Sequence, residues 1–235
     1  MTHRTIRVGV TLPTFREDAA ALGFARDAEA AGLDGVFVFD HLWPMGRPDR
    51  PALAAFPLLG AVAAVTDRVV LGPLVARVGL VPDDVMVHRF LALAGLAPGR
   101  VVAGLGTGDA KSAAENHAYG VPVLDAPARR RSLAALASTL SGSGLPVWIG
   151  GGSRATVDVA VTAGGAVNLW EAGPAAVAAQ AARTEVTWGG PVPADGDGIV
   201  ALLAPLAAAG ATWVVCAWPA SLQAVADAAD RLRQG

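Results

Sequence analysis

The chain alternates between short apolar runs and segments compatible with helix, and this alternation repeats eight times. The runs lack the strict apolar–polar alternation of a strand with one wet face, which is typical of strands buried on both faces. Alternating strands and helices predict a parallel sheet, and eight such units are the number that closes a (β/α)8 barrel. The runs span residues 6–12, 35–39, 68–75, 100–106, 146–151, 166–170, 184–188 and 212–218, and the expected helices span 16–31, 52–66, 84–95, 127–140, 153–163, 173–182, 198–209 and 220–233.

The sequence predicts an α/β fold in one domain, a single barrel over residues 1–235 with short loops and no large insertion. Hydrophobic residues make up 53% of the chain and charged residues 16%, which supplies a large core and excludes a disordered chain. No linker divides the chain, because the Pro/Gly-rich segment 189–198 lies where a loop after a strand belongs. An open, doubly wound sheet is the alternative fold.

The charge and cysteine content narrow the partners and the compartment. A formal net charge of −2 gives no electrostatic basis for binding nucleic acid or an anionic membrane. The single cysteine, Cys216, excludes an internal disulfide and is typical of a reducing cytoplasm. Its apolar surroundings predict a small buried side chain. The first residues lack the apolar core of a signal peptide, so we expect a cytoplasmic protein.

One uncharged stretch, residues 198–226, is long enough to span a bilayer. Pro205, Gly210 and Pro219 interrupt it, and its second half is rich in β-forming residues. A helix, a turn and a buried strand therefore explain the stretch better than a membrane span.

Candidate catalytic residues follow the second strand. In a parallel barrel the active site is built from the loops at the carboxyl ends of the strands. Asp40 and His41 occupy one such end, and a histidine beside a carboxylate can act as general acid or base near neutral pH. The alternative is that Asp40 caps the following turn and His41 is an ordinary loop residue. No two histidines have the spacing of metal ligands, so no metal is expected.

Two glycine-rich stretches follow other strands. Gly150, Gly151, Gly152 and Ser153 precede an expected helix, whose free N–H groups and dipole favour an anion such as phosphate. The alternative is a serine cap after a flexible loop. Arg77 and Arg154 either add positive charge there or face water.

The stretch Gly104-Leu-Gly106-Thr-Gly108 superficially suggests a dinucleotide fingerprint. It follows the fourth strand rather than the first, and a basic segment replaces the acidic residue that the fingerprint requires. A Rossmann site is therefore a weak interpretation of these glycines.

Taken in order, these strand ends resemble the luciferase-like monooxygenase superfamily, in its coenzyme F420-dependent branch. The matching segments are "FVFDHLW", "RVVLGPLV", "LAPGRVVAGLGTGDAKSAAENHAYG", "PVWIGGGS" and "AVNLW". The resemblance implies a (β/α)8 barrel that binds a deazaflavin or a flavin. It also implies hydride transfer at the central face of that ring, and a homodimer is common among similar proteins.

The resemblance assigns roles to residues of this chain. His41, oriented by Asp40, would transfer a proton beside the ring, and Asp109 matches a carboxylate proposed as an acid. Gly150 to Ser153 would hold the phosphate, while the ring would lie over the ends of the third and fourth strands. The expected ring contacts are Pro73, Leu74 and Val75, at a cis-peptide bulge, together with Gly106, Thr107 and Gly108. The expected walls of the substrate pocket are Thr11, Trp43, Trp170 and Trp188.

The sequence thus predicts an oxidoreductase that uses F420, or alternatively FMN, on a small apolar organic substrate. The chain is shorter than many members of the superfamily, which predicts a small or open pocket. A barrel that binds the cofactor without catalysis, as a carrier or regulatory subunit, is the alternative function.

Overall fold

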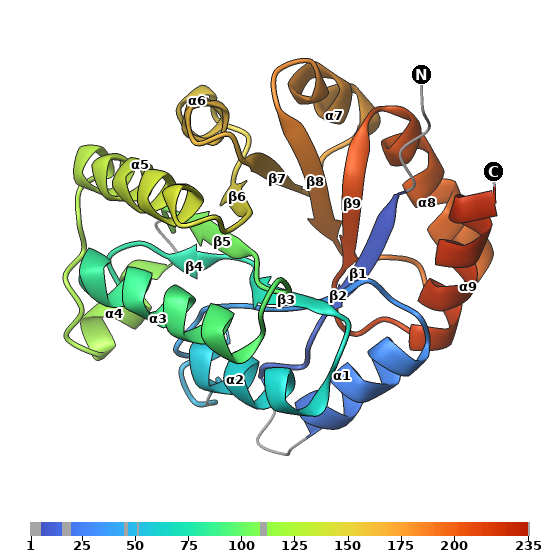
Figure 1. The fold of residues 1–235 in the computed structure, drawn as a ribbon, viewed down its shortest axis with the longest axis horizontal. Helices are drawn as coiled ribbons and strands as arrows, with labels where there is room; N and C mark the ends of the chain where they lie inside the picture. The colour runs from blue at the N-terminus through green and yellow to red at the C-terminus, as the bar shows by residue number, and fades with distance from the viewer. Residues whose placement is uncertain (1–5, 16–19, 45–46, 51, 109–111, 235) are drawn as a thin grey trace.

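The computed structural model describes residues 6–15, 20–44, 47–50, 52–108 and 112–234 (Figure 1). Its strands are β1 (Arg7–Thr11), β2 (Gly35–Val38), β3 (Val70–Pro73), β4 (Ala76–Arg77), β5 (Ala103–Gly106), β6 (Val147–Gly150), β7 (Ala166–Trp170), β8 (Glu185–Gly190) and β9 (Ala211–Cys216). Its helices are α1 (Ala20–Ala30), α2 (Ala55–Val65), α3 (Asp83–Leu96), α4 (Ala113–Ala118), α5 (Ala126–Gly142), α6 (Arg154–Thr162), α7 (Pro174–Ala181), α8 (Gly196–Ala208) and α9 (Leu222–Gln234).

The strands form one parallel sheet that curls into a nearly closed barrel, with the helices around its outside (Figure 1). Sequential strands are neighbours except for β3 and β4, and β9 returns to pair with β1. The two ends of the sheet are β3 and β4, and a parallel bridge between Leu71 and Val101 connects the β3 end to the segment before β5. The predicted barrel is therefore confirmed.

The third strand differs from the continuous run predicted over residues 68–75. It breaks into β3, which pairs with β2, and β4, which pairs with β5. The peptide bond between Leu74 and Val75, in the break, is cis. A further difference is α4, a short helix between β5 and α5 that the apolar pattern did not indicate.

The interior of the barrel is filled largely by aromatic side chains. The ring centroids of Phe37 and Trp148 lie 5.1 Å apart, and those of Trp148 and Trp213 lie 5.4 Å apart. Glycine makes this packing possible, because a Cβ on Gly35 would lie 2.9 Å from the ring of Phe37 and 3.0 Å from that of Trp213. A second apolar layer lies between the strands and the surrounding helices.

The uncharged stretch near the carboxyl end forms α8, a turn at Gly210 and β9, as the sequence predicts. Within the described residues, none of the helices combines the length and the apolar character that crossing a membrane requires.

Candidate active site

A cavity of about 630 Å³ opens at the carboxyl ends of the strands. It brings together many residues that the sequence nominated from segments far apart in the chain. The nominated residues in its lining are Asp40, His41, Leu74, Val75, Gly106, Thr107, Gly108, Gly150, Gly151, Gly152, Ser153 and Trp170. Most of the exposed lining surface is apolar. The cavity can therefore hold a flat organic group beside a few polar side chains.

An aromatic wall forms one side of the cavity. The rings of Phe15 and Phe39 are stacked with centroids 6.1 Å apart, and the Trp170 ring meets Phe39 edge-on at 5.7 Å. Trp170 is 43% exposed and its indole N–H donates to the Glu171 carboxylate at 2.8 Å. Phe15 and Phe39 were not nominated from the sequence, although Phe39 directly precedes Asp40.

The glycines of β5 and β6 make room for the broken third strand. A Cβ on Gly104 would lie 2.0 Å from the Pro73 carbonyl oxygen, and one on Gly106 would lie 2.4 Å from Cγ2 of Val75. At Gly150 it would lie 3.1 Å from Cγ1 of Val75. At these positions Pro73 and Val75 take the space that a side chain would need, and contact of Gly106 and Gly150 with a cofactor ring stays a prediction. Val75 lines the cavity, whereas Pro73 lies outside its lining.

His41 is held by a glutamate that the sequence analysis did not nominate. Its Nδ1 lies 3.0 Å from Oε2 of Glu115, which comes from α4 and is 1% exposed. The Leu42 backbone N–H donates to Oε1 of the same carboxylate, and the guanidinium of Arg77 donates to Oε1 at 2.9 Å. Three nitrogen atoms, from His41, Leu42 and Arg77, thus converge on one buried carboxylate.

Asp40 therefore has a different role from the one expected. Its carboxylate accepts the backbone N–H of Arg77 at 3.1 Å, and its carbonyl oxygen accepts Nε–H of Arg77 at 2.9 Å. Burial raises the pKa of Asp40, against the opposing effects of that hydrogen bond and of nearby positive charge from Arg77, His41 and Arg89. Asp40 fixes the β4 end, and Glu115 orients the imidazole of His41.

The two candidate arginines lie in opposite environments. Arg77 is 5% exposed and its guanidinium is shared among Glu115, the Asp40 carbonyl and the amide oxygen of Asn116. The side chain of Arg154 is 93% exposed, on the surface of α6. Arg77 is a buried structural cation, and Arg154 faces water.

Ser153 caps α6. Its Oγ accepts the backbone N–H of Thr156 at 3.2 Å, as an N-cap serine does. The Gly151 N–H donates to the Asn168 carbonyl at 3.0 Å, which anchors the loop to β7. The first residues of α6 keep backbone N–H groups without intrahelical partners, at the edge of the cavity.

Three nominated wall residues, Thr11, Trp43 and Trp188, lie outside the cavity lining. Thr11 is buried and its Oγ1 accepts the Trp218 backbone N–H at 2.8 Å, so it joins β1 to the segment after β9. Trp43 packs against Tyr119 at a centroid distance of 5.8 Å. Asp109, the nominated acid, lies outside the described residues.

Trp188 requires a correction for a geometric reason. Side chains of a strand alternate between its two faces, and Thr187 points inward, where it accepts a hydrogen bond from the Asn168 amide at 2.9 Å. Trp188 therefore points outward into the layer beneath the helices, and its indole N–H donates to the Ala172 carbonyl at 2.9 Å. The presence of an aromatic residue near a strand end does not indicate to which face of the strand its side chain points.

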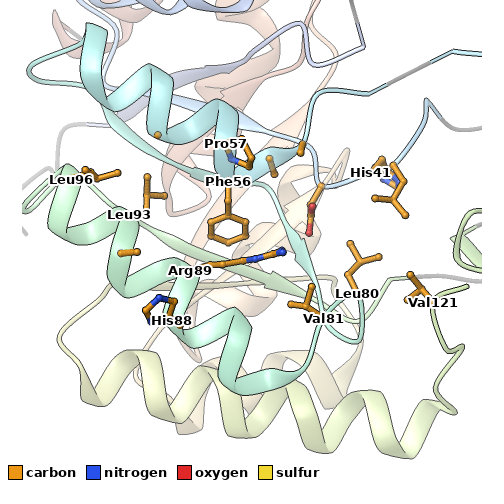
Figure 2. A pocket seen from close by; sticks show the side chains of 16 residues that line it. His41, Phe56, Pro57, Leu80, Val81, His88, Arg89, Leu93, Leu96 and Val121 are labelled. Atoms are coloured by element: carbon orange, nitrogen blue, oxygen red, sulfur yellow. The ribbon is translucent and has the colours of Figure 1, made fainter. Parts of the chain in front are cut away.

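A second cavity of about 480 Å³, the helix groove, lies between α2 and α3 and also reaches Asp40 and His41 (Figure 2). Figure 2 shows Arg89 extending from α3 along this groove, and its guanidinium lies 5.7 Å from the centre of the Phe56 ring. Leu96, at one end of the groove, is 66% exposed. The Asp40–His41 segment thus separates the strand-end cavity from an apolar groove in the helix layer.

Glu115 had only a weak signal in the sequence. Glu115 lies in the "GLGTGDAKSAAENHAYG" stretch, six residues beyond the nominated Asp109. A single acidic residue in an Ala-rich segment predicts an exposed side chain, and only the folded position of α4 buries it.

Among the described residues, no cluster of histidine, cysteine and carboxylate side chains is arranged to bind a metal.

Comparisons with known proteins identify a family and individual relatives of this chain. The family model described as luciferase-like monooxygenase matches residues 6–141. An F420-dependent glucose-6-phosphate dehydrogenase of Nakamurella multipartita is 42% identical over 84 residues, and one of Beutenbergia cavernae is 58% identical over 45 residues. These matches cover 35% and 19% of this chain, but only 25% and 13% of the relatives' own lengths.

The fold extends the likeness over nearly the whole chain. A solved F420-dependent secondary alcohol dehydrogenase, in complex with an F420–acetone adduct, superposes with a TM-score of 0.79. The superposition covers 97% of this chain and 98% of that one at 13% sequence identity, so it establishes the shared fold alone.

Proposed function

Since this chain belongs to the luciferase-like monooxygenase family, we propose that it is an oxidoreductase that transfers a hydride between coenzyme F420 and a small apolar organic substrate. The alternative cofactor is FMN. The observation that carries the proposal is the apolar cavity of about 630 Å³ with His41 in its wall. The relatives and the superposed dehydrogenase have F420 in their names, which favours F420 over FMN.

The residues of the cavity fit a flat tricyclic ring with a phosphate-bearing tail. Leu74 and Val75 give an apolar surface at the broken third strand, and the aromatic wall of Phe15, Phe39 and Trp170 stands at another side. The exposed Gly151–Ser153 loop and the first N–H groups of α6 would hold the phosphate. F420 or FMN, when bound, supplies the ring position that accepts or gives a hydride.

The protein's own contribution is orientation and proton transfer. His41 lines the cavity with 19% of its side chain exposed, so it is accessible to a substrate yet fixed by Glu115. It would take the proton of a substrate hydroxyl as the hydride leaves, or return a proton in the reverse direction. The apolar walls would hold both reactants together and exclude water, which is where much of the rate gain arises.

The charge of the lining favours an uncharged substrate. Among the described residues that line the cavity, the arginine is Arg77, and its guanidinium is already bonded to Glu115, Asn116 and the Asp40 carbonyl. The relatives are named for a sugar phosphate, yet the described lining offers no unengaged arginine or lysine for a phosphate monoester. An apolar alcohol or ketone fits the aromatic wall better.

Spectral titration of the purified protein with F420 and, separately, with FMN tests the proposal. We expect saturable binding of F420 and weaker or no binding of FMN. Saturable binding of FMN alone would change the assigned cofactor, and no binding of either would refute the proposal.

The proton role is tested by His41→Ala in the same titration and in a turnover assay over a panel of apolar alcohols. Retained F420 binding with lost turnover is expected. Binding in both proteins with turnover in neither would instead favour a cofactor carrier or regulatory subunit. The homodimer expected from the resemblance stays a prediction, which sedimentation equilibrium tests directly.

A further inference from the structure

We infer that Glu115 is a positioning residue that fixes His41 in the tautomer carrying its proton on Nδ1, so that Nε2 is the nitrogen that exchanges protons in the cavity. The inference rests on the proposed function for its catalytic meaning. The tautomer itself, however, is a property of the protein alone. Asp40, the residue next to His41, does not supply this contact.

The bonding pattern at Glu115 determines the proton's position. The Arg77 guanidinium and the Leu42 N–H have no acceptor capacity, so both must donate to Oε1. An ionised carboxylate has only acceptor sites, and Arg77 supplies the compensating charge for a glutamate that is 1% exposed. Nδ1 of His41, 3.0 Å from Oε2, must therefore donate as well.

A neutral imidazole carries one proton, so with Nδ1–H fixed the lone pair resides on Nε2. Within the described part of the chain, no hydrogen bond to Nε2 is found. His41 lines the strand-end cavity, so a reacting group there meets Nε2 as the open ring nitrogen. Glu115 thereby selects one of the two neutral tautomers of His41 and leaves Nε2 as the nitrogen that can accept a proton.

The charges around His41 come from several elements. Glu115 of α4 contacts it directly, and Arg77 of β4 contacts Glu115 and Asp40. Asp40 adjoins His41 in the chain, and Arg89 of α3 extends along the helix groove toward the same segment (Figure 2). Arg77 contacts Glu115 at Oε1 and His41 contacts it at Oε2, so the two oxygens have separate partners. This separation makes a precise substitution possible.

Glu115→Gln is the test, because it replaces one carboxylate oxygen by an NH2 group with little change in shape. The amide oxygen must stay toward Arg77 and Leu42, since the opposite orientation would set an NH2 donor against two other donors. The NH2 group then faces Nδ1 of His41 and donates to it. Nδ1 must accept, and the ring proton moves to Nε2.

The readout is the ¹⁵N spectrum of the histidine rings in the cofactor-free protein, above the pH at which the imidazole is protonated. The chain has four histidines, and His41→Gln identifies the His41 signals by their loss. We expect protonated Nδ1 and bare Nε2 in the wild type and the reverse in Glu115→Gln. Asn116→Ala is the matched control, because it removes a partner of Arg77 from the same helix while leaving Glu115 in place. It should keep the Nδ1–H tautomer.

Turnover with F420 then separates the two proposals. Glu115→Gln should lower kcat by about 10²- to 10⁴-fold, the range of general acid–base contributions, with cofactor binding retained. An unchanged tautomer in Glu115→Gln, or Nε2–H in the wild type, would overturn the inference whatever the activity. A reversed tautomer with undiminished kcat would support the positioning of His41 by Glu115 and refute instead the proton role of His41 in the proposed function.

Discussion

The contact between Gly106 of β5 and Val75 of the broken third strand predicts a specific pattern of coupled destabilisation. A Cβ added at Gly106 would lie 2.4 Å from Cγ2 of Val75, more than 1 Å inside an ordinary contact. Val75 has little freedom to rotate away, because a β-branched side chain has few favourable χ1 rotamers. Gly106→Ala is therefore expected to cost about 1–3 kcal/mol of unfolding free energy.

Truncating Val75 should relieve that cost. In Val75→Ala the nearest remaining side-chain atom to the added Cβ is the Val75 Cβ at 3.5 Å, an ordinary van der Waals distance. Val75→Ala alone removes two half-buried methyl groups and should cost about 1 kcal/mol. The double variant should be no less stable than Val75→Ala, which gives a favourable coupling energy of about 1–3 kcal/mol.

Gly104→Ala is the control that separates side chain from backbone. Its Cβ would lie 2.0 Å from the Pro73 carbonyl oxygen, which no side-chain truncation removes, so Val75→Ala should not rescue it. Equilibrium denaturation in urea of the wild type and all five variants gives each free energy. Additive effects of Gly106→Ala and Val75→Ala, or an equal rescue of Gly104→Ala, would refute the packing argument.

Three further outcomes are expected. Burial raises the pKa of Asp40 above its usual 3.8, so its contribution to stability is fully present below that pH and is lost as the pH rises through the raised value. Asp40→Asn should remove this part of the pH dependence in denaturation curves, and parallel curves for the two proteins would contradict it. Burial also raises the pKa of the Cys216 thiol to about 12, so iodoacetamide should label the unfolded protein and leave the folded one unlabelled by mass spectrometry. In the cofactor-free protein, Ser153→Ala should lower the unfolding free energy by about 1 kcal/mol, because the α6 cap is lost. A decrease in unfolding free energy of only a few tenths of a kcal/mol, obtained from thermal unfolding, would argue against the cap.

The barrel was largely predictable because its signals are local and repeated. Apolar runs of strand length, separated by helical segments, predict a parallel sheet, and the observed strands fall within or close to all eight runs. Pro205 and Gly210 likewise indicated where the uncharged stretch turns from helix to strand. The third run was predicted to be continuous and is broken in the structure, because the apolar pattern carries no information about hydrogen-bond pairing with two different neighbours.

Proximity to a strand end predicted many cavity residues, but not the direction of side chains. Trp188 is an example: it lies near the carboxyl end of its strand and yet points outward, because Thr187 takes the inward position. Gly106 shows the same limit, since a glycine at the end of a strand indicates that another group approaches closely but not which group it is. Asp40 was likewise chosen as the partner of His41 because the two are adjacent in sequence.

By itself the sequence determined the number of strand–helix units, the parallel sheet and the edge of the barrel that carries the site. These features were predictable because the apolar pattern, and the Gly and Pro residues that end helices and strands, are signals contained within a few neighbouring residues. The tertiary structure alone decided that Glu115, 74 residues from His41, lies beside Nδ1 of its ring, and that Val75 fills the space left by Gly106. These contacts join residues whose separation in the chain carries no signal, and they arise only when the barrel closes and α4 packs beside β4.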